Sequence, residues 1–115
     1  MSPSRPRQAA FTQSAPVFAA LGDPTRLGLV ARLCGDGPLS IVRLSEGAGV
    51  SRQAVTKHLA ALSDAGLVKH RWEGRERVFE LEPARLALAQ RHLEDISSQW
   101  DRALSRLKAF VESDR

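Results

Sequence analysis

The chain has 115 residues and a mass of 12.6 kDa, a size typical of one domain. Apolar residues make up 43% and charged residues 26%, a composition that excludes both a disordered chain and a membrane-spanning one. The single cysteine excludes a disulfide framework and a cysteine-rich metal module. The net charge of +4 favours a polyanionic partner, and the lack of an apolar block behind Arg5 and Arg7 predicts a cytoplasmic protein rather than a secreted one.

The first ten residues contain two prolines and two arginines among few apolar side chains, so residues 1–10 are expected to form a mobile basic arm. Residues 11–115 are expected to form a single domain. Its first element is a short helix over residues 15–21, which places Val17 and Phe18 on one apolar face.

A second helix is predicted where Asp23 is followed by Pro24. Aspartate accepts hydrogen bonds from the free N–H groups of a first helical turn, and proline loses nothing at the first helical position. The helix is expected to run to about Leu33, because Gly-Asp-Gly-Pro at residues 35–38 breaks it. Its expected buried residues are Leu27, Val30 and Cys34, the last interpreted as a small buried side chain rather than a redox switch.

The next stretch has the pattern of two helices joined by a glycine-containing turn. Ser40 can cap a short helix whose apolar residues Ile41 and Leu44 face inward. Glycines within residues 47–49 allow a sharp turn, and Ser51 can cap the helix that follows.

This following helix is amphipathic, and Gly66 is placed to end it. Its buried stripe is expected to consist of Val55, Leu59 and Leu62. Its opposite face carries Arg52, Gln53, Thr56, Lys57 and Ala60.

A basic hairpin is predicted next, with strands over residues 67–72 and 76–81 around Gly74. Its basic residues are Arg71, Arg75 and Arg77, and Trp72 is expected to anchor it. Between residues 51 and 77 there are six lysines and arginines against three acidic residues, so positive charge is concentrated in this part of the chain.

The last helix is expected to extend from Pro83 to about residue 112, with apolar residues in a nearly unbroken 3,4 alternation. A helix of about 30 residues spans about 45 Å, whereas a compact domain of this size has a radius of gyration near 13 Å. The helix should therefore overhang the core and expose an apolar seam unless a second copy covers it, which predicts a homodimer. The residues expected at the dimer interface are Val17, Phe18, Leu93, Ile96, Trp100, Ala103 and Leu107.

Helix, turn, helix and basic hairpin in this order predict a mainly α winged helix-turn-helix fold, with a two-stranded β-hairpin wing and a long carboxy-terminal dimerisation helix. In such a fold the second helix of the motif enters the DNA major groove. Arginine and glutamine can pair with guanine and adenine edges there, and wing arginines can reach the DNA backbone or a neighbouring minor groove. The predicted DNA-binding residues are Ser51, Arg52, Gln53, Thr56, Lys57, His58, Arg71, Arg75 and Arg77, with packing or a phosphate hydrogen bond favoured over base reading for His58.

Three segments, ALGDPTRLGLVARL, LSEGAGVSRQAVTKHLAALSDAGLV and WEGRERVFEL, resemble in this order the ArsR family of small bacterial winged-helix repressors. The resemblance covers about residues 15–112. It implies a dimer formed by the first and last helices, operator DNA read by the fourth helix, and repression relieved by a signal.

Many members of that family sense metals through a Cys-x-Cys pair before the recognition helix, or through Asp, His and Glu on the last helix. This sequence has no thiol in residues 40–44, and its last helix offers only His92 with Glu94 and Asp95, at spacings that spread them over different faces. The segments RQAVTKHL and ISSQWDRALSRLKAFVE resemble more closely the metal-free branch of the family, whose genes often neighbour START-like ligand-binding proteins. No metal site and no cofactor is expected.

The sequence-based hypothesis is a homodimeric repressor of its own or a neighbouring operon, which occupies a pseudo-palindromic DNA operator in competition with RNA polymerase and does not respond to metals. The effector, if one exists, is unknown. The alternative is a winged helix used for protein–protein contact without DNA binding, which would favour an apolar or acidic outer face over the polar and basic one between Arg52 and Lys57. An enzyme is not expected, because no Ser/Cys–His pair stands in a catalytic context and no glycine-rich phosphate loop follows a strand.

Overall fold

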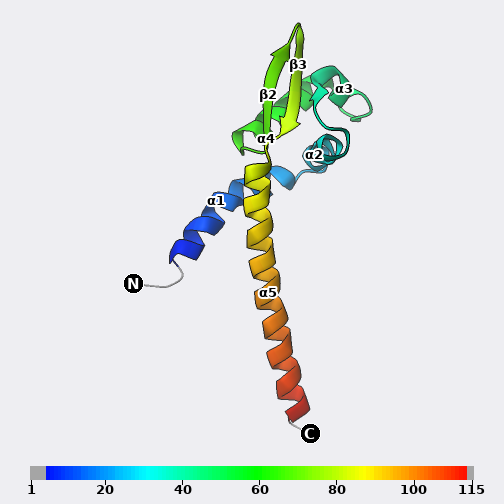
Figure 1. Ribbon diagram of the computed structural model, residues 1–115. Helices are drawn as coiled ribbons and strands as arrows, with labels where there is room; N and C mark the ends of the chain where they lie inside the picture. Colours follow the sequence, from blue (N-terminus) through cyan, green and yellow to red (C-terminus); the bar gives the residue numbers. More distant parts are fainter. Residues whose placement is uncertain (1–4, 114–115) are drawn as a thin grey trace.

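The computed structural model describes the backbone of residues 5–113 and the side chains of residues 12–113. Figure 1 shows a head of short helices and a small sheet, from which one long helix extends. The order of elements is α1 (Arg5–Leu21), α2 (Pro24–Asp36), β1 (Leu39–Ser40), α3 (Ile41–Ser45), α4 (Arg52–Asp64), β2 (Val68–Glu73), β3 (Glu76–Leu81) and α5 (Pro83–Ser113). The predicted winged helix-turn-helix fold is confirmed, with α3 and α4 as the motif and β2 and β3 as the wing.

Helix α1 begins at Arg5 rather than near residue 15, so the predicted start of the first helix is wrong. Pro6 lies in the first turn of the helix, where a missing N–H removes no intrahelical hydrogen bond, and Gln8 to Ala10 have good helix propensity. Residues 5–10 therefore belong to α1, and residues 1–4 of the expected arm lie outside the described residues.

Helix α2 starts as predicted, with the Asp23 carboxylate accepting a hydrogen bond from the Arg26 N–H at 3.0 Å and Pro24 in the first turn. Its buried face differs from the prediction. Leu27 is 53% exposed and Cys34 is exposed, whereas Val30 is buried as expected. Leu29 and Leu33 take the other buried positions, because they face the remaining helices of the head.

The helix-turn-helix is capped at both predicted serines. Ser40 Oγ accepts from the Arg43 N–H at 3.2 Å, and Ser51 Oγ accepts from the Ala54 N–H at 3.1 Å. Gly66, which follows α4, has a φ of +77°, a left-handed conformation that ordinary side chains rarely adopt.

The wing belongs to a three-stranded antiparallel sheet of order β1-β3-β2, instead of being an isolated two-stranded hairpin. The short strand β1 pairs Leu39 with Phe79 and Ser40 with Val78. Because β1 leads directly into α3, this pairing joins the wing to the first helix of the motif. One hydrophobic core holds the head together, and its residues include Val17, Leu29, Val30, Leu33, Ile41, Leu44, Val55, Leu59, Leu62, Leu67, Val68, Phe79 and Ala89.

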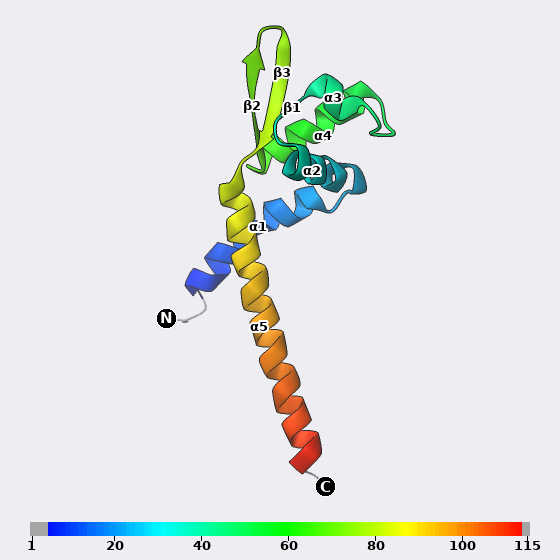
Figure 2. The ribbon, with the colours of Figure 1, turned by 45° about the vertical axis from the view of Figure 1, so that its right-hand side comes forward.

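Helix α5 leaves the head and runs far beyond it, as both ribbon views show (Figures 1 and 2). The Cα radius of gyration is 19.2 Å, well above the roughly 13 Å of a compact chain of this length. Only the first part of α5 packs on the head, where α1 crosses it. No helix among the described residues is long and apolar enough to cross a membrane.

Candidate nucleic-acid interface

Helix α4 presents one polar face to solvent and one apolar face to the core. Its stripe of Val55, Leu59 and Leu62 is completely buried, as predicted. The first two turns expose Arg52, Gln53, Thr56 and Lys57 on the other side. The Thr56 hydroxyl donates to the Arg52 carbonyl at 2.9 Å, so its donor is used within the helix while its side chain stays on the outer surface. The arrangement leaves donors of three types at the amino end of one fixed helix.

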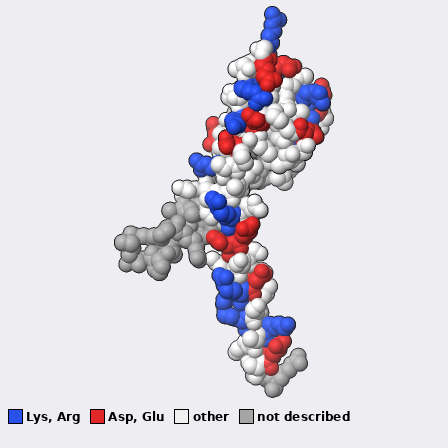
Figure 3. Space-filling view, in the orientation of Figure 1, with Lys and Arg blue, Asp and Glu red and all other residues white. Residues whose placement is uncertain are grey.

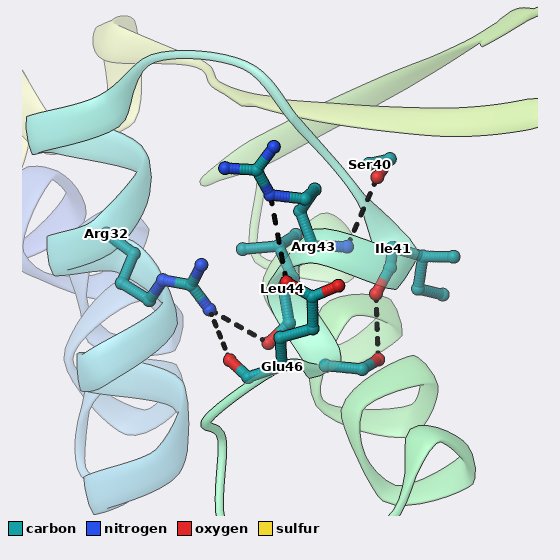
Figure 4. Close-up of polar contacts among 7 residues, drawn as sticks. Arg32, Ser40, Ile41, Arg43, Leu44 and Glu46 are labelled. Atoms are coloured by element: carbon teal, nitrogen blue, oxygen red, sulfur yellow. Dashed lines mark hydrogen bonds and ion pairs between the residues drawn. The ribbon is translucent and has the colours of Figure 1, made fainter.

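Arg32 of α2 fixes the position of α3. Its guanidinium donates to the carbonyl oxygens of Leu44 and Glu46, both at 3.1 Å, at the end of α3 (Figure 4). Those carbonyls have no partner further along the helix, so the arginine satisfies them. The contact fixes α3 on α2, and α3 in turn packs on α4.

His58 does not lie on the outer face of α4 with the other predicted DNA-binding residues. Its Nδ1 lies 3.3 Å from a guanidinium nitrogen of Arg26 and 3.9 Å from a carboxylate oxygen of Asp23. The ring is therefore turned towards the beginning of α2, which agrees with packing rather than base reading.

The two faces of the wing differ in charge. Arg71 forms ion pairs with Glu73 and Glu80, both at 2.9 Å, and Lys69 pairs with Glu82 at 3.6 Å. The hydrogen bond to Glu73, with the nearby Glu80 carboxylate, raises the pKa of Arg71 above its ordinary value. Exposed pairs of this kind add little stability, but they neutralise the charge that was expected to reach DNA from Arg71.

Arg75 and Arg77 carry the uncompensated charge of the wing. Within residues 12–113 neither takes part in an ion pair. Arg75 lies in the turn between β2 and β3, and Figure 3 shows a basic side chain projecting past the tip of the hairpin. The Arg77 guanidinium lies 5.1 Å from the centre of the Phe79 ring and 3.4 Å from His70 Nε2. These contacts hold Arg77 on the side of the sheet that faces α4.

Trp72 does not anchor the wing, because its side chain is 65% exposed. It pairs across the hairpin with Arg77, so both lie on the α4 side of the sheet. The two residues line a pocket of about 290 Å³ together with Arg52 and Thr56 of α4. Sequence reasoning missed this pocket, although the period-2 alternation of strand residues places Trp72 and Arg77 on one face once the register is known.

A helix-turn-helix domain family matches residues 21–71. The chain is 39% identical over 97 residues to the HTH-type transcriptional regulator Rv2034 of Mycobacterium tuberculosis, covering 84% of this chain and 87% of that protein. The fold matches an ArsR-like transcriptional regulator from Rhodococcus sp. RHA1 with a TM-score of 0.74 and 39% identity, covering 89% of this chain and 95% of the other. The chain belongs to the ArsR family. Its function class is DNA-binding transcriptional regulation, and regulators of this family are not enzymes.

The similarity extends, at 29% identity over 97 residues, to the arsenical resistance operon repressor of Escherichia coli, covering 84% of this chain and 80% of that protein.

The candidate metal ligands of α5 do not lie together. In this ArsR-family chain, His92 is buried and its Nδ1 is hydrogen-bonded to the Ser14 hydroxyl of α1. Glu94 and Asp95 are exposed elsewhere on α5. The side chains of residues 12–113 include no group of three or more His, Cys, Asp or Glu that could hold a metal ion.

The residues predicted for a dimer interface divide into two sets. Val17 is buried in the core of its own protomer, so its assignment to an interface is wrong. Phe18 is partly exposed and Ala103 is exposed. The large side chains exposed along α5 are Leu93, Ile96, Trp100, Leu104, Leu107, Phe110 and Val111, which extends the predicted set by three residues.

Proposed function

We propose that this ArsR-family chain is a homodimeric repressor that occupies a pseudo-palindromic operator and is not released by metal ions. The observation that carries the proposal is the polar outer face of α4, which three completely buried residues hold in a fixed orientation on the head. A helix held in this way can present its amino-terminal residues to base edges in the major groove.

The side chains of this face divide into two groups by the contacts they can make. Arg52 and Gln53 stand in the first turn of α4, where they can read guanine and adenine edges, and Thr56 can meet a thymine methyl group. Lys57, Arg75 and Arg77 are cations without a carboxylate partner among residues 12–113, which suits them to phosphates. Ser51 caps the helix at the same end. The opposing hypothesis of a protein-contact module is weaker, because this surface is polar and basic and not apolar.

The dimer is supported by the exposed stripe on α5. From Leu93 to Val111 the large apolar side chains share one helix face over about 27 Å. A surface of this kind is unfavourable in water unless it is covered. A second copy related by a two-fold axis would cover it with the same stripe.

Insensitivity to metals is supported by the positions of the side chains that could ligate one. His92 is directed inward to Ser14, and Cys34 stands alone on the exposed side of α2. An ion shifts an equilibrium between two states only by binding them with different affinity. Because the candidate ligands of this chain lie apart, an ion should bind the two states with similar affinity.

Footprinting on the DNA upstream of the chain's own gene tests the proposal. We expect one protected region with two inverted half-sites about one helical turn apart, and light scattering should give a mass about twice 12.6 kDa for the free protein. Protection that is uniform along the fragment, or a monomer at micromolar concentration, would contradict it.

A further inference from the structure

We infer that the pocket between α3, α4 and the wing seats one phosphate of the DNA backbone, with the Trp72 ring packed against the adjoining deoxyribose. The inference rests on the proposed function and adds a contact point to it. Tryptophan at residue 72 thereby becomes a DNA-contacting residue.

The pocket is built by three elements that meet at the DNA-facing side of the head. α3 contributes Val42, α4 contributes Arg52 and Thr56, and the wing contributes Trp72, Arg75 and Arg77. Its volume is about 290 Å³, which lies at the lower limit of small-molecule sites. It suits a compact group better than a complete effector molecule. The same residues border the exposed face of α4, so whatever fills the pocket also contacts the major-groove helix.

The charge of the pocket selects an anion. Three guanidinium groups border it against one carboxylate, that of Glu76. Within residues 12–113, none of these four groups forms an ion pair. The opposite side of the same hairpin is arranged differently, because there Arg71 and Lys69 are both paired with glutamates. Positive charge is therefore left unpaired only on the side that faces α4, where guanidinium groups can bind phosphate oxygens with directed hydrogen bonds.

Trp72 gives the pocket an apolar side. Its side chain is 65% exposed, although the residues on either side of it in β2, Arg71 and Glu73, are charged. A large aromatic side chain held on a strand loses little entropy when another molecule covers it, and its burial is favourable. Beside a phosphate, the apolar surface that DNA offers is the deoxyribose. The combination of guanidinium groups and one aromatic ring thus matches a sugar–phosphate unit.

Intrinsic fluorescence tests this contact directly, because the chain has two tryptophans and no tyrosine. The emission of Trp72 is obtained as the difference between the wild type and a Trp72→Phe variant, which leaves Trp100 of the α5 stripe unchanged. Adding duplex DNA should change the Trp72 emission with the same midpoint that the anisotropy of labelled DNA reports. An anisotropy increase without any change in Trp72 emission would overturn the inference and leave the proposed function intact, whereas no anisotropy increase on any DNA would remove the proposed function itself.

Affinity measurements test the contribution of the Trp72 ring to DNA binding separately from that of the neighbouring arginines. Trp72→Ala should weaken operator and random DNA alike, by about tenfold, and Trp72→Phe should recover most of the loss. Circular dichroism and thermal unfolding should show both variants folded, since the ring is mostly exposed. Wild-type affinity in Trp72→Ala would contradict the inference.

The salt dependence of binding counts the phosphates. If Arg75 and Arg77 share one phosphate, replacing both by glutamine should lower the slope of log K against log salt by about 0.9, whereas two separate phosphates would lower it by about 1.8. Arg102→Gln, on the polar side of α5, is the control for net charge. A fall near 1.8 would overturn the shared seat.

Inorganic phosphate distinguishes a backbone seat from a free-anion site. In the absence of DNA, inorganic phosphate up to millimolar concentration should change Trp72 emission no more than chloride does at the same ionic strength. A saturable response to phosphate at micromolar concentration would show a free-anion site and overturn the assignment to DNA.

Discussion

Nδ1 of His58 in α4 lies 3.9 Å from Oδ2 of Asp23, the residue that caps α2. Arg26 completes the cluster, with its backbone N–H on the Asp23 carboxylate at 3.0 Å and its Nε donating to the Ala20 carbonyl of α1 at 2.6 Å. One small polar cluster therefore joins three helices, including the one that presents the DNA-contacting face. Its titration should be visible in the stability of the protein.

The pKa of Asp23 is lowered from 3.8, first by the hydrogen bond from the Arg26 N–H and further by the charges of His58 and Arg26. A carboxylate whose pKa is lower in the folded state adds stability above its unfolded pKa, and that contribution disappears as the pH falls through the folded value. Urea unfolding between pH 2 and 6 should therefore show a loss below about pH 4 that is smaller in Asp23→Asn. Identical pH profiles for the two proteins would contradict this role of Asp23.

Ser51 allows the stability of α4 to be separated from its charge. Ser51→Ala removes the cap on the Ala54 N–H and should lower the free energy of unfolding by about 1 kcal/mol. Ser51→Asp retains a capping oxygen, so it should unfold nearly as the wild type does, yet it adds a negative charge beside Arg52 and should weaken DNA binding. Chemical unfolding and DNA affinity measured on both variants check this. A Ser51→Asp variant that binds DNA like the wild type would place this end of α4 away from the phosphates.

The exposed stripe of α5 predicts which residues hold two copies together. Ile96→Asp or Trp100→Asp should put a charge into the covered surface at a cost of several kcal/mol, giving a monomer by light scattering at concentrations where the wild type is a dimer. Arg102→Asp, on the opposite side of α5, is the matched control and should remain dimeric. If all three variants keep the wild-type mass, the stripe is not the interface.

The extent to which the sequence predicts this fold depends on how far each element is determined locally. Helix α4 was predicted with its cap and its buried face, because Ser51, the 3.6-residue stripe and Gly66 are all local signals. Helix α2 offered two overlapping apolar stripes, and only the packing of the other helices selects Leu29 and Leu33 over Leu27. Strand β1 has only two residues and depends on its pairing with β3, so no local sequence pattern predicts it.

The exposed polar face of α4 was predictable from the sequence, whereas the charge pattern of the wing was less so. Counting charges gave the correct basic character, but the count does not show that Arg71 is neutralised by Glu73 and Glu80 while Arg77 is not. That difference depends on the register of β2 against β3. Trp72 was assigned to the wrong environment for the same reason, since an aromatic residue in a strand is buried or exposed according to what covers its face.

Metal titration tests the proposed insensitivity. Zn²⁺, Cd²⁺, Ni²⁺ and arsenite should leave the protein–operator complex intact at physiological concentrations, as measured by fluorescence anisotropy. Cys34→Ser is the control for nonspecific binding at the exposed thiol. Stoichiometric release by one ion that persists in Cys34→Ser and vanishes in His92→Ala would establish a metal site on α5, provided that circular dichroism shows the His92→Ala variant folded.

The central claim, that the outer face of α4 reads DNA sequence, is tested most directly by the discrimination of one variant between two duplexes. Anisotropy titrations should compare Gln53→Ala with the wild type on the footprinted operator and on a scrambled duplex at the same salt concentration, with Arg75→Ala as the control that weakens both duplexes equally. We predict that Gln53→Ala loses about 1–3 kcal/mol of binding free energy on the operator and almost none on the scrambled duplex. An equal loss on both duplexes would show that this face does not read bases and would contradict the account.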